Sequence, residues 1–174
     1  MREFERAVKV HQRSVFTFAR YLLGSQQEAE DVAQEALLRM WRHWDNLDSE
    51  RLEAWLMQVT RNLCYDQLRR LRAKRNALPE TADETAADRV ASEELDPEQE
   101  AHGRALGSRL VEAVRELREP YRSAIILREI QGLSYREIGE ALGVPLNSVK
   151  VHVHRGRRML RETLREKELH VATS

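Results

Sequence analysis

The sequence predicts an all-α protein made of two small helical domains, an N-terminal three-helix bundle and a C-terminal four-helix domain, joined by a flexible acidic linker. Apolar residues recur every three or four positions along most of the chain, and only seven glycines and four prolines interrupt its 174 residues. Charge is strongly segregated. Residues 1–75 hold 14 basic and 11 acidic side chains, residues 76–103 hold one and nine, and residues 104–174 hold 14 and nine. A net charge of zero therefore does not argue against a nucleic-acid partner.

Residues 1–75 are expected to form the three-helix bundle around one core. Gly24-Ser25 ends the first helix, and a polar loop interrupts the helical spacing later in the segment. Cys64, the only cysteine, lies among the core positions of the third helix, so we expect it to be buried, with a redox role as the alternative. The expected elements are helices at 4–23, 26–44 and 52–75 and the loop Asp45–Arg51.

Residues 76–103 have no large apolar stripe, two prolines and a dense negative charge. Such a stretch cannot bury enough apolar surface to fold alone, so we expect a linker with at most a short helical turn. Helical spacing resumes at Leu106, and Pro120 starts a further helix that ends at Gly132. Residues 104–168 are therefore expected to form a four-helix domain, followed by a polar tail at 169–174.

Residues 133–158 predict a helix-turn-helix with a basic second helix. Gly143 stands where the chain must reverse, Pro145 suits the first turn of the next helix, and Gly139 fits a close crossing. A basic helix of this kind fits the DNA major groove; the alternative is a solvated basic helix on an ordinary bundle. The outer stripe carries Asn147, Lys150, Val151, His154 and Arg158, and Arg155 and Arg157 flank it.

The third helix of the first domain carries a second nucleic-acid signature. Cations follow phosphates, whereas Asn and Tyr hydrogen-bond to or stack on unpaired bases, a mixture suited to single-stranded DNA. Basic helix ends also occur on inert proteins, so a solvated face is the alternative. The outer side of this helix carries Arg61, Asn62, Tyr65, Arg69, Arg72 and Lys74.

The second helix exposes a mixed acidic and apolar stripe. Leu38 beside Trp41 on this face predicts a protein partner with the tryptophan as its anchor. The alternative is a solvated acidic face with the tryptophan tucked into the core. The stripe consists of Glu28, Asp31, Gln34, Glu35, Leu38 and Trp41.

Three segments resemble, in order and spacing, the successive signatures of bacterial extracytoplasmic-function sigma factors, and together they span almost the whole chain. They are AEDVAQEALLRMWRHWDNL, AWLMQVTRNLCYDQLRR and YRSAIILREIQGLSYREIGEALGVPLNSVKVHVHRGRRML. The resemblance implies that residues 1–75 are sigma region 2 and residues 104–168 are sigma region 4. It also implies a function: binding core RNA polymerase and directing promoter-specific initiation, with the minus-thirty-five element read as duplex and the minus-ten element as melted strand.

The resemblance further implies roles for particular residues. The polymerase partners are the β′ clamp and the β flap, and the clamp contacts are Asp31, Gln34, Glu35, Leu38 and Trp41. The minus-ten base flipped out of the duplex is captured by the loop residues Asp45, Asn46, Leu47, Asp48, Ser49 and Arg51. The melted strand is lined by Asn62, Tyr65, Asp66 and Arg69, together with Arg61 and Arg72. The minus-thirty-five bases are read by Lys150, Val151, His154 and Arg155, and phosphates are held by Tyr135, Arg136, Ser148 and Arg157. The linker is expected to thread toward the polymerase active-site channel.

Two positions depart from the family pattern. Val151 and His152 stand where the family usually has a small polar residue and an arginine. Val151 can contact a thymine methyl group but cannot hydrogen-bond to a base. We therefore expect an unusual minus-thirty-five preference.

Competing functions account for less of the sequence. No nucleophile with a base, cysteine cluster or phosphate-binding glycine loop is present, so we expect no enzyme, cofactor or metal site. His152 and His154 point about 200° apart on a helix and cannot share an ion. An autonomous dimeric regulator would need a dimer interface or a ligand pocket, and would bind DNA strongly without polymerase. An anti-sigma or adaptor role leaves both DNA-facing surfaces unexplained.

The remaining expectations concern the setting in which the chain acts. Its charged N-terminus lacks a secretion signal, and no run of residues is apolar enough to span a membrane. We therefore expect a cytoplasmic protein that is monomeric when unbound. We also expect no added sensory domain after residue 168, and therefore regulation by a separate anti-sigma factor.

Overall fold

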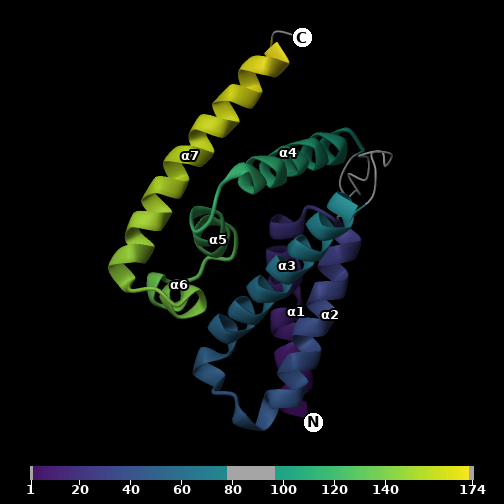
Figure 1. Ribbon diagram of the computed structural model, residues 1–174, viewed down its shortest axis with the longest axis vertical. Helices are drawn as coiled ribbons and strands as arrows, with labels where there is room; N and C mark the ends of the chain where they lie inside the picture. The colour runs from purple at the N-terminus through teal and green to yellow at the C-terminus, as the bar shows by residue number, and fades with distance from the viewer. Residues whose placement is uncertain (1, 78–96, 173–174) are drawn as a thin grey trace. The chain divides into compact units, whose positions relative to one another are not determined.

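The structure, a computed structural model, describes residues 2–77 and 97–172 and is all-α over these ranges (Figure 1). The chain divides into two compact units, Met1–Asp88 and Arg89–Ser174, and each is described by itself. No described helix is long and apolar enough to cross a membrane. The first unit contains α1 (Arg2–Leu23), α2 (Gln26–His43), η1 (Trp44–Asn46), η2 (Ser49–Arg51) and α3 (Leu52–Ala77). The second contains α4 (Pro97–Glu116), α5 (Tyr121–Ile125), η3 (Ile126–Ile130), α6 (Tyr135–Leu142) and α7 (Leu146–Ala172).

The three long helices of the first unit pack against one another as a bundle (Figure 1). Gly24, at φ 79°, ends α1, and the Ser25 hydroxyl accepts a hydrogen bond from the Glu28 backbone N–H at 3.4 Å to begin α2. Cys64 is fully buried and burial raises the pKa of its thiol, which confirms the core assignment. Burying a large apolar side chain stabilises a fold by about 1.5–3 kcal/mol. The largest such side chains here are Phe18, Leu22, Met40, Leu56 and Met57.

The segment predicted as a plain loop between the second and third helices contains two short 3-10 turns, η1 and η2. The Asp48 carboxylate accepts a hydrogen bond from the Glu50 backbone N–H at 3.0 Å and caps η2. The Trp44 ring in η1 packs edge-on against Phe4 of α1, with ring centroids 5.3 Å apart. Local capping and one ring contact therefore give this loop a defined shape.

Three helices extend beyond the boundaries expected from the sequence. Residues 97–103 of the expected linker form the start of α4, where Pro97 suits a first helical turn. Residues 76–77 belong to α3, and residues 169–172 of the expected tail continue α7. The remainder of the expected linker, including its predicted path toward the polymerase channel, lies outside the described residues.

The second unit is built around α5 and the π-helical segment η3, where the sequence predicted one uninterrupted helix. Backbone N–H groups of Gln131 and Leu133 donate to the carbonyls of Ile126 and Leu127 at 3.0 and 2.9 Å, so the helix widens before it ends. The helix α5 contacts both α4 and α7. The fully buried side chains Ile125, Ile126 and Leu127 form the centre of this core.

Candidate nucleic-acid interface

The helices α6 and α7 form the predicted helix-turn-helix. Ser134 and Glu137 cap α6 reciprocally: the Ser134 hydroxyl accepts from the Glu137 N–H at 3.3 Å, and the Glu137 carboxylate accepts from the Ser134 N–H at 2.7 Å. These hydrogen bonds lower the pKa of Glu137. Gly143, at φ 67°, ends α6 in the left-handed conformation that the turn requires.

The two helices of the motif cross closely at Gly139. A Cβ atom placed there would lie 3.0 Å from the Val144 carbonyl oxygen and 3.6 Å from a methyl carbon of Val149. Ile138, Val149 and Val153 are fully buried between the helices and the rest of the unit. This buried face determines which side of α7 points outward.

The outward face of α7 is exposed along the whole predicted base-reading stripe. Val151 is 45% exposed, so an apolar side chain stands on this face among polar and cationic neighbours. A methyl-bearing side chain in that place can contact a thymine methyl group. The exposed members are Asn147, Lys150, Val151, His154, Arg155 and Arg158.

The residues expected to hold phosphates have more varied surroundings. Arg136 is exposed, and its Nε atom lies 3.4 Å from Glu140 Oε1. Ser148 is half-buried at the start of α7. The Tyr135 ring is half-buried, with the Arg128 guanidinium 4.9 Å from its centroid. These three residues lie at the start of α6 or of α7.

Arg157 is already engaged within the unit. Its Nε and Nη2 atoms lie 2.7 and 2.6 Å from the Glu129 carboxylate of η3, and hydrogen bonding to that carboxylate raises the pKa of Arg157. A phosphate would have to share or displace this partner. Glu129 lies 28 residues earlier in the chain, so no local pattern in the sequence indicates the pairing.

The predicted single-strand face of α3 is also accessible. The Arg61 guanidinium lies 5.2 Å from the centroid of the half-buried Tyr65 ring, Asn62 and Arg72 are exposed, and Asp66 forms an ion pair with Arg69. Asn62 lies ten residues into the helix, about 15 Å along its axis from the first residue. A strand that contacts both this face and the preceding loop must therefore span several nucleotides.

The loop before α3 presents most of its predicted contact residues to solvent. Asp45, Asn46, Asp48, Ser49 and Arg51 are exposed, and Leu47 is half-buried. The end of α2 and the start of α3 are joined beside the loop by the rings of His43 and Trp55, whose centroids lie 6.0 Å apart. The loop therefore exposes polar residues to solvent, while the helix ends on either side of it are packed together.

The predicted protein-contact stripe on α2 borders an apolar groove. Leu38 is 47% and Trp41 59% exposed, so the alternative in which the tryptophan is tucked into the core is wrong. The groove measures about 490 Å³ and is lined by Phe4, Val8, Gln34, Leu37, Leu38 and Trp41. Sequence reasoning missed Phe4 and Val8 as groove residues, because their helical spacing on α1 matches that of the core positions.

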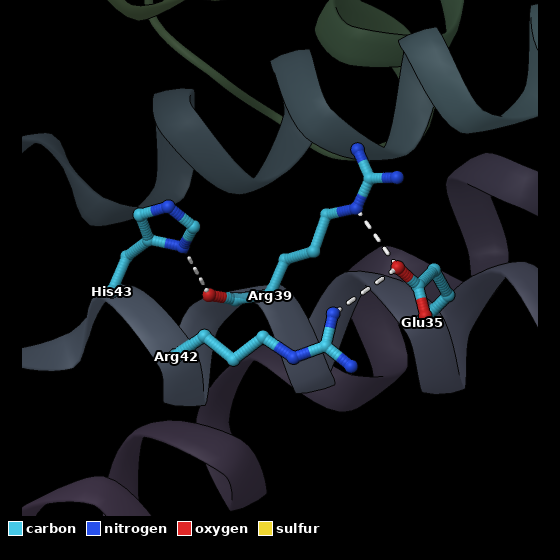
Figure 2. A network of polar contacts seen from close by, with 4 residues as sticks. All are labelled: Glu35, Arg39, Arg42 and His43. Carbon is cyan, nitrogen blue, oxygen red and sulfur yellow. Dashed lines mark hydrogen bonds and ion pairs between the residues drawn. The ribbon is translucent and has the colours of Figure 1, made fainter.

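The stripe is less acidic than its sequence indicates. Glu35 Oε1 accepts a hydrogen bond from Arg39 Nε at 3.0 Å and lies 3.9 Å from Arg42 Nη1 (Figure 2). His43 Nδ1 donates to the Arg39 carbonyl oxygen at 2.9 Å, which links the same turn to the end of α2. Two guanidinium groups therefore accompany the carboxylate. Asp31 and Gln34, earlier in the stripe, are exposed.

Each of the two units matches a known protein family. Residues 7–74 match the family model of sigma-70 region 2, and residues 108–160 match that of sigma-70 region 4. The chain is 39% identical to the ECF RNA polymerase sigma factor SigE of Mycolicibacterium smegmatis over 175 residues, covering all of this chain and 66% of that protein. It is 31% identical to the ECF RNA polymerase sigma factor SigW of Bacillus subtilis over 167 residues, covering 94% of this chain and 89% of that one.

Two solved structures have a similar fold. One is the sigma factor RpoE in complex with the anti-sigma factor NepR from Bartonella quintana, with 26% identity and a TM-score of 0.74 over 95% of this chain and 98% of that one. The other is CnrH in complex with the cytosolic domain of CnrY, with 23% identity and a TM-score of 0.67 over 95% of this chain and 89% of that one. The second likeness concerns the fold alone.

Proposed function

This chain belongs to the extracytoplasmic-function sigma factors of the sigma-70 family, which direct transcription initiation at promoters, and we propose that it reads one promoter element as duplex and the other as melted strand. One observation carries this proposal. Each compact unit exposes residues for which the sequence predicts nucleic-acid binding, and the two sets differ in chemistry: a helix-turn-helix on one unit and an Arg, Asn and Tyr strip on the other. A regulator of duplex DNA alone leaves the second face without a role.

In the second unit, α7 enters the major groove of the minus-thirty-five duplex. Lys150 and Arg155 supply donors for guanine, and Asn147 can pair with adenine. Each good base contact contributes on the order of 1–3 kcal/mol of discrimination. Phosphate contacts add an electrostatic contribution to affinity, which falls as the salt concentration rises. The exposure of the whole stripe supports this assignment, because no residue of it has to be uncovered first.

In the first unit, α3 and the preceding loop hold the melted minus-ten strand. Asn62 is exposed for hydrogen bonding to a base, and the Tyr65 ring beside Arg61 offers a stacking surface next to a cation. Opening base pairs costs a few kcal/mol, which stacking and pocket contacts to the extruded base offset. The polar loop Asp45–Arg51 is the proposed pocket for that base.

The groove between α1 and α2 is the proposed docking site for the core polymerase clamp. Trp41 and Leu38 supply exposed apolar surface, and Gln34 adds a polar contact on the same wall. A half-exposed tryptophan at the edge of an apolar groove has the character of a binding anchor. The second unit would dock on the β flap. Because both contacts are with RNA polymerase, the proposed place of action is the cytoplasm.

An anti-sigma factor is the second proposed partner. The RpoE structure to which this chain is similar contains the anti-sigma factor NepR. That likeness supports an equivalent regulator for this chain.

Run-off transcription with purified bacterial core polymerase tests the proposed function. Discrete transcripts from a promoter library should appear only when the chain is added. The DNA upstream of their start sites then gives the preferred promoter sequence. Tight duplex binding by the chain alone, with no transcript, would instead indicate the autonomous dimeric regulator.

A further inference from the structure

Arg155 contacts a residue that lies outside the helix-turn-helix. Its Nη1 atom lies 3.5 Å from the phenol oxygen of Tyr121, the first residue of α5, which is 34 positions earlier in the chain. This separation is at the long end for an N–H···O hydrogen bond, so the contact biases the exposed guanidinium without locking it. What the contact does depends on how firmly Tyr121 itself is held.

The backbone of Tyr121 is held by a close helix crossing. A Cβ atom placed on Gly156 would lie 2.5 Å from Cγ1 of Ile125 and 3.3 Å from the Tyr121 carbonyl oxygen, so α5 and α7 approach at a distance that glycine permits. Ile125 is fully buried, and α5 therefore cannot slide along α7 without disturbing the core. Gly156 directly follows Arg155, so the crossing brings Tyr121 to the level of that arginine.

The orientation of the Tyr121 ring is set by two further side chains. His152, one turn before Gly156 on α7, packs edge-on against the ring, with centroids 5.9 Å apart and planes at 80°. The Arg118 guanidinium lies 5.6 Å from the ring centroid. Hydrogen bonding from Arg155, aided by the charge of Arg118 and opposed by burial, lowers the pKa of Tyr121. The phenol oxygen of Tyr121 therefore faces cationic donors, one of which, Arg155, belongs to the exposed stripe of α7.

We propose that Tyr121 is a positioning residue, which holds the Arg155 guanidinium in the direction from which it reads the minus-thirty-five duplex. This inference rests on the proposed function. A long arginine side chain loses rotamer freedom when it binds, and a side chain that is oriented beforehand loses less. Tyr121 therefore contributes to base selection without contacting DNA.

The test uses holoenzyme assembled from the full chain and core polymerase, on a promoter library randomised across the minus-thirty-five element. Arg155→Ala should abolish the preference at one base pair, because it removes a base contact. Tyr121→Phe keeps the ring but removes the hydroxyl, and should weaken the same preference about threefold with an unchanged salt slope. In the Arg155→Ala background, Tyr121→Phe should cause no further change in promoter affinity or in base preference. Tyr21→Phe, the same change on α1, is the matched control.

The outcomes separate the inference from the proposed function. The positioning role would be overturned if the Tyr121→Phe holoenzyme had the base preference of the wild type. It would also be overturned if Tyr121→Phe lowered promoter affinity equally with and without Arg155. A gain of affinity would do the same, since it would mean that the phenol competes with DNA for the guanidinium. If the wild-type holoenzyme selects no sequence at all, the proposed function itself fails.

Discussion

Gly156 shows how a single missing side chain organises the second unit. Glycine within a helix costs about 1 kcal/mol relative to alanine, so its presence in the middle of α7 requires a reason. The reason is the approach of α5, whose Ile125 side chain occupies the space where a Cβ atom would stand. The same close approach places Tyr121 beside α7.

Gly156→Ala should destabilise the second unit by about 1–3 kcal/mol, because the new methyl group overlaps the buried Ile125 side chain. Gly107→Ala in α4 is the matched control, since a Cβ atom there meets nothing within 4 Å. That change should leave the protein as stable or increase the free energy of unfolding by up to about 1 kcal/mol. Urea unfolding followed by circular dichroism distinguishes the two. Equal effects of both substitutions would contradict the close crossing.

His152 on α7 is half-buried, with one ring nitrogen enclosed by the fold. Its Nδ1 atom is buried and makes no hydrogen bond to the described residues, and burial, followed by the charge of Arg155, lowers its pKa below 6.5. Below that pH the unfolded chain takes up the proton before the folded chain does, so the free energy of unfolding should fall as the solution is acidified.

The pH effect is measurable in two ways. The nuclear magnetic resonance titration of the His152 ring should have its midpoint below 6.5. The free energy of unfolding should fall less between neutral and acidic pH in His152→Gln, which has no group to protonate there, than in the wild type. A midpoint above 6.5, or the same pH dependence in both proteins, would show that this imidazole is not held in its neutral form.

At the scale of elements, α1 and α2 do more than fill a core. Their apolar positions extend past the buried layer, so that Phe4 and Val8 from one helix and Leu38 and Trp41 from the other line a shared groove. The groove residues Gln34, Leu38 and Trp41 alternate along α2 with the ion-paired residues. These are Glu35, Arg39 and Arg42, which Figure 2 shows. An apolar anchor with charges beside it gives a partner both affinity and register.

Trp41→Ala should weaken binding of the chain to core polymerase by about tenfold or more, because it removes the most exposed apolar side chain of the groove. Val10→Ala is the control, since Val10 is also a large apolar side chain on the surface, 62% exposed, but does not line the groove. Affinity is measured by titrating labelled chain with core polymerase. Wild-type affinity in Trp41→Ala would remove the groove from the polymerase interface.

The elements that the sequence predicted well are those whose signals are local. Gly143, the apolar spacing around Ile138 and Val149, and the exposed stripe of α7 all follow from residues a few positions apart. The pairing of Arg157 with Glu129 and the contact of Arg155 with Tyr121 join residues 28 and 34 positions apart, and no periodic pattern encodes them. Helix ends were the least predictable feature, as the start of α4 at Pro97 illustrates.

At the scale of the whole molecule, the two units divide the proposed work by the form of DNA that each reads. In the proposed function, Asn62 and Tyr65 on α3 of the first unit contact a single strand, and the exposed Lys150 and Arg155 on α7 of the second contact a duplex. Each interface is completed within its own unit, so a substitution in one should leave the fold of the other intact. Loss of duplex recognition and loss of melting should therefore be separable.

Permanganate footprinting of a promoter selected by the holoenzyme tests this division most directly. With the wild-type chain, thymines near the start site should become reactive. With Asn62→Ala, the holoenzyme should still protect the minus-thirty-five duplex, but these thymines should lose their reactivity. With Lys150→Ala, protection and reactivity should fall together. If Asn62→Ala opens the promoter as fully as the wild type does, or loses duplex protection as Lys150→Ala does, the two units do not divide promoter recognition in this way.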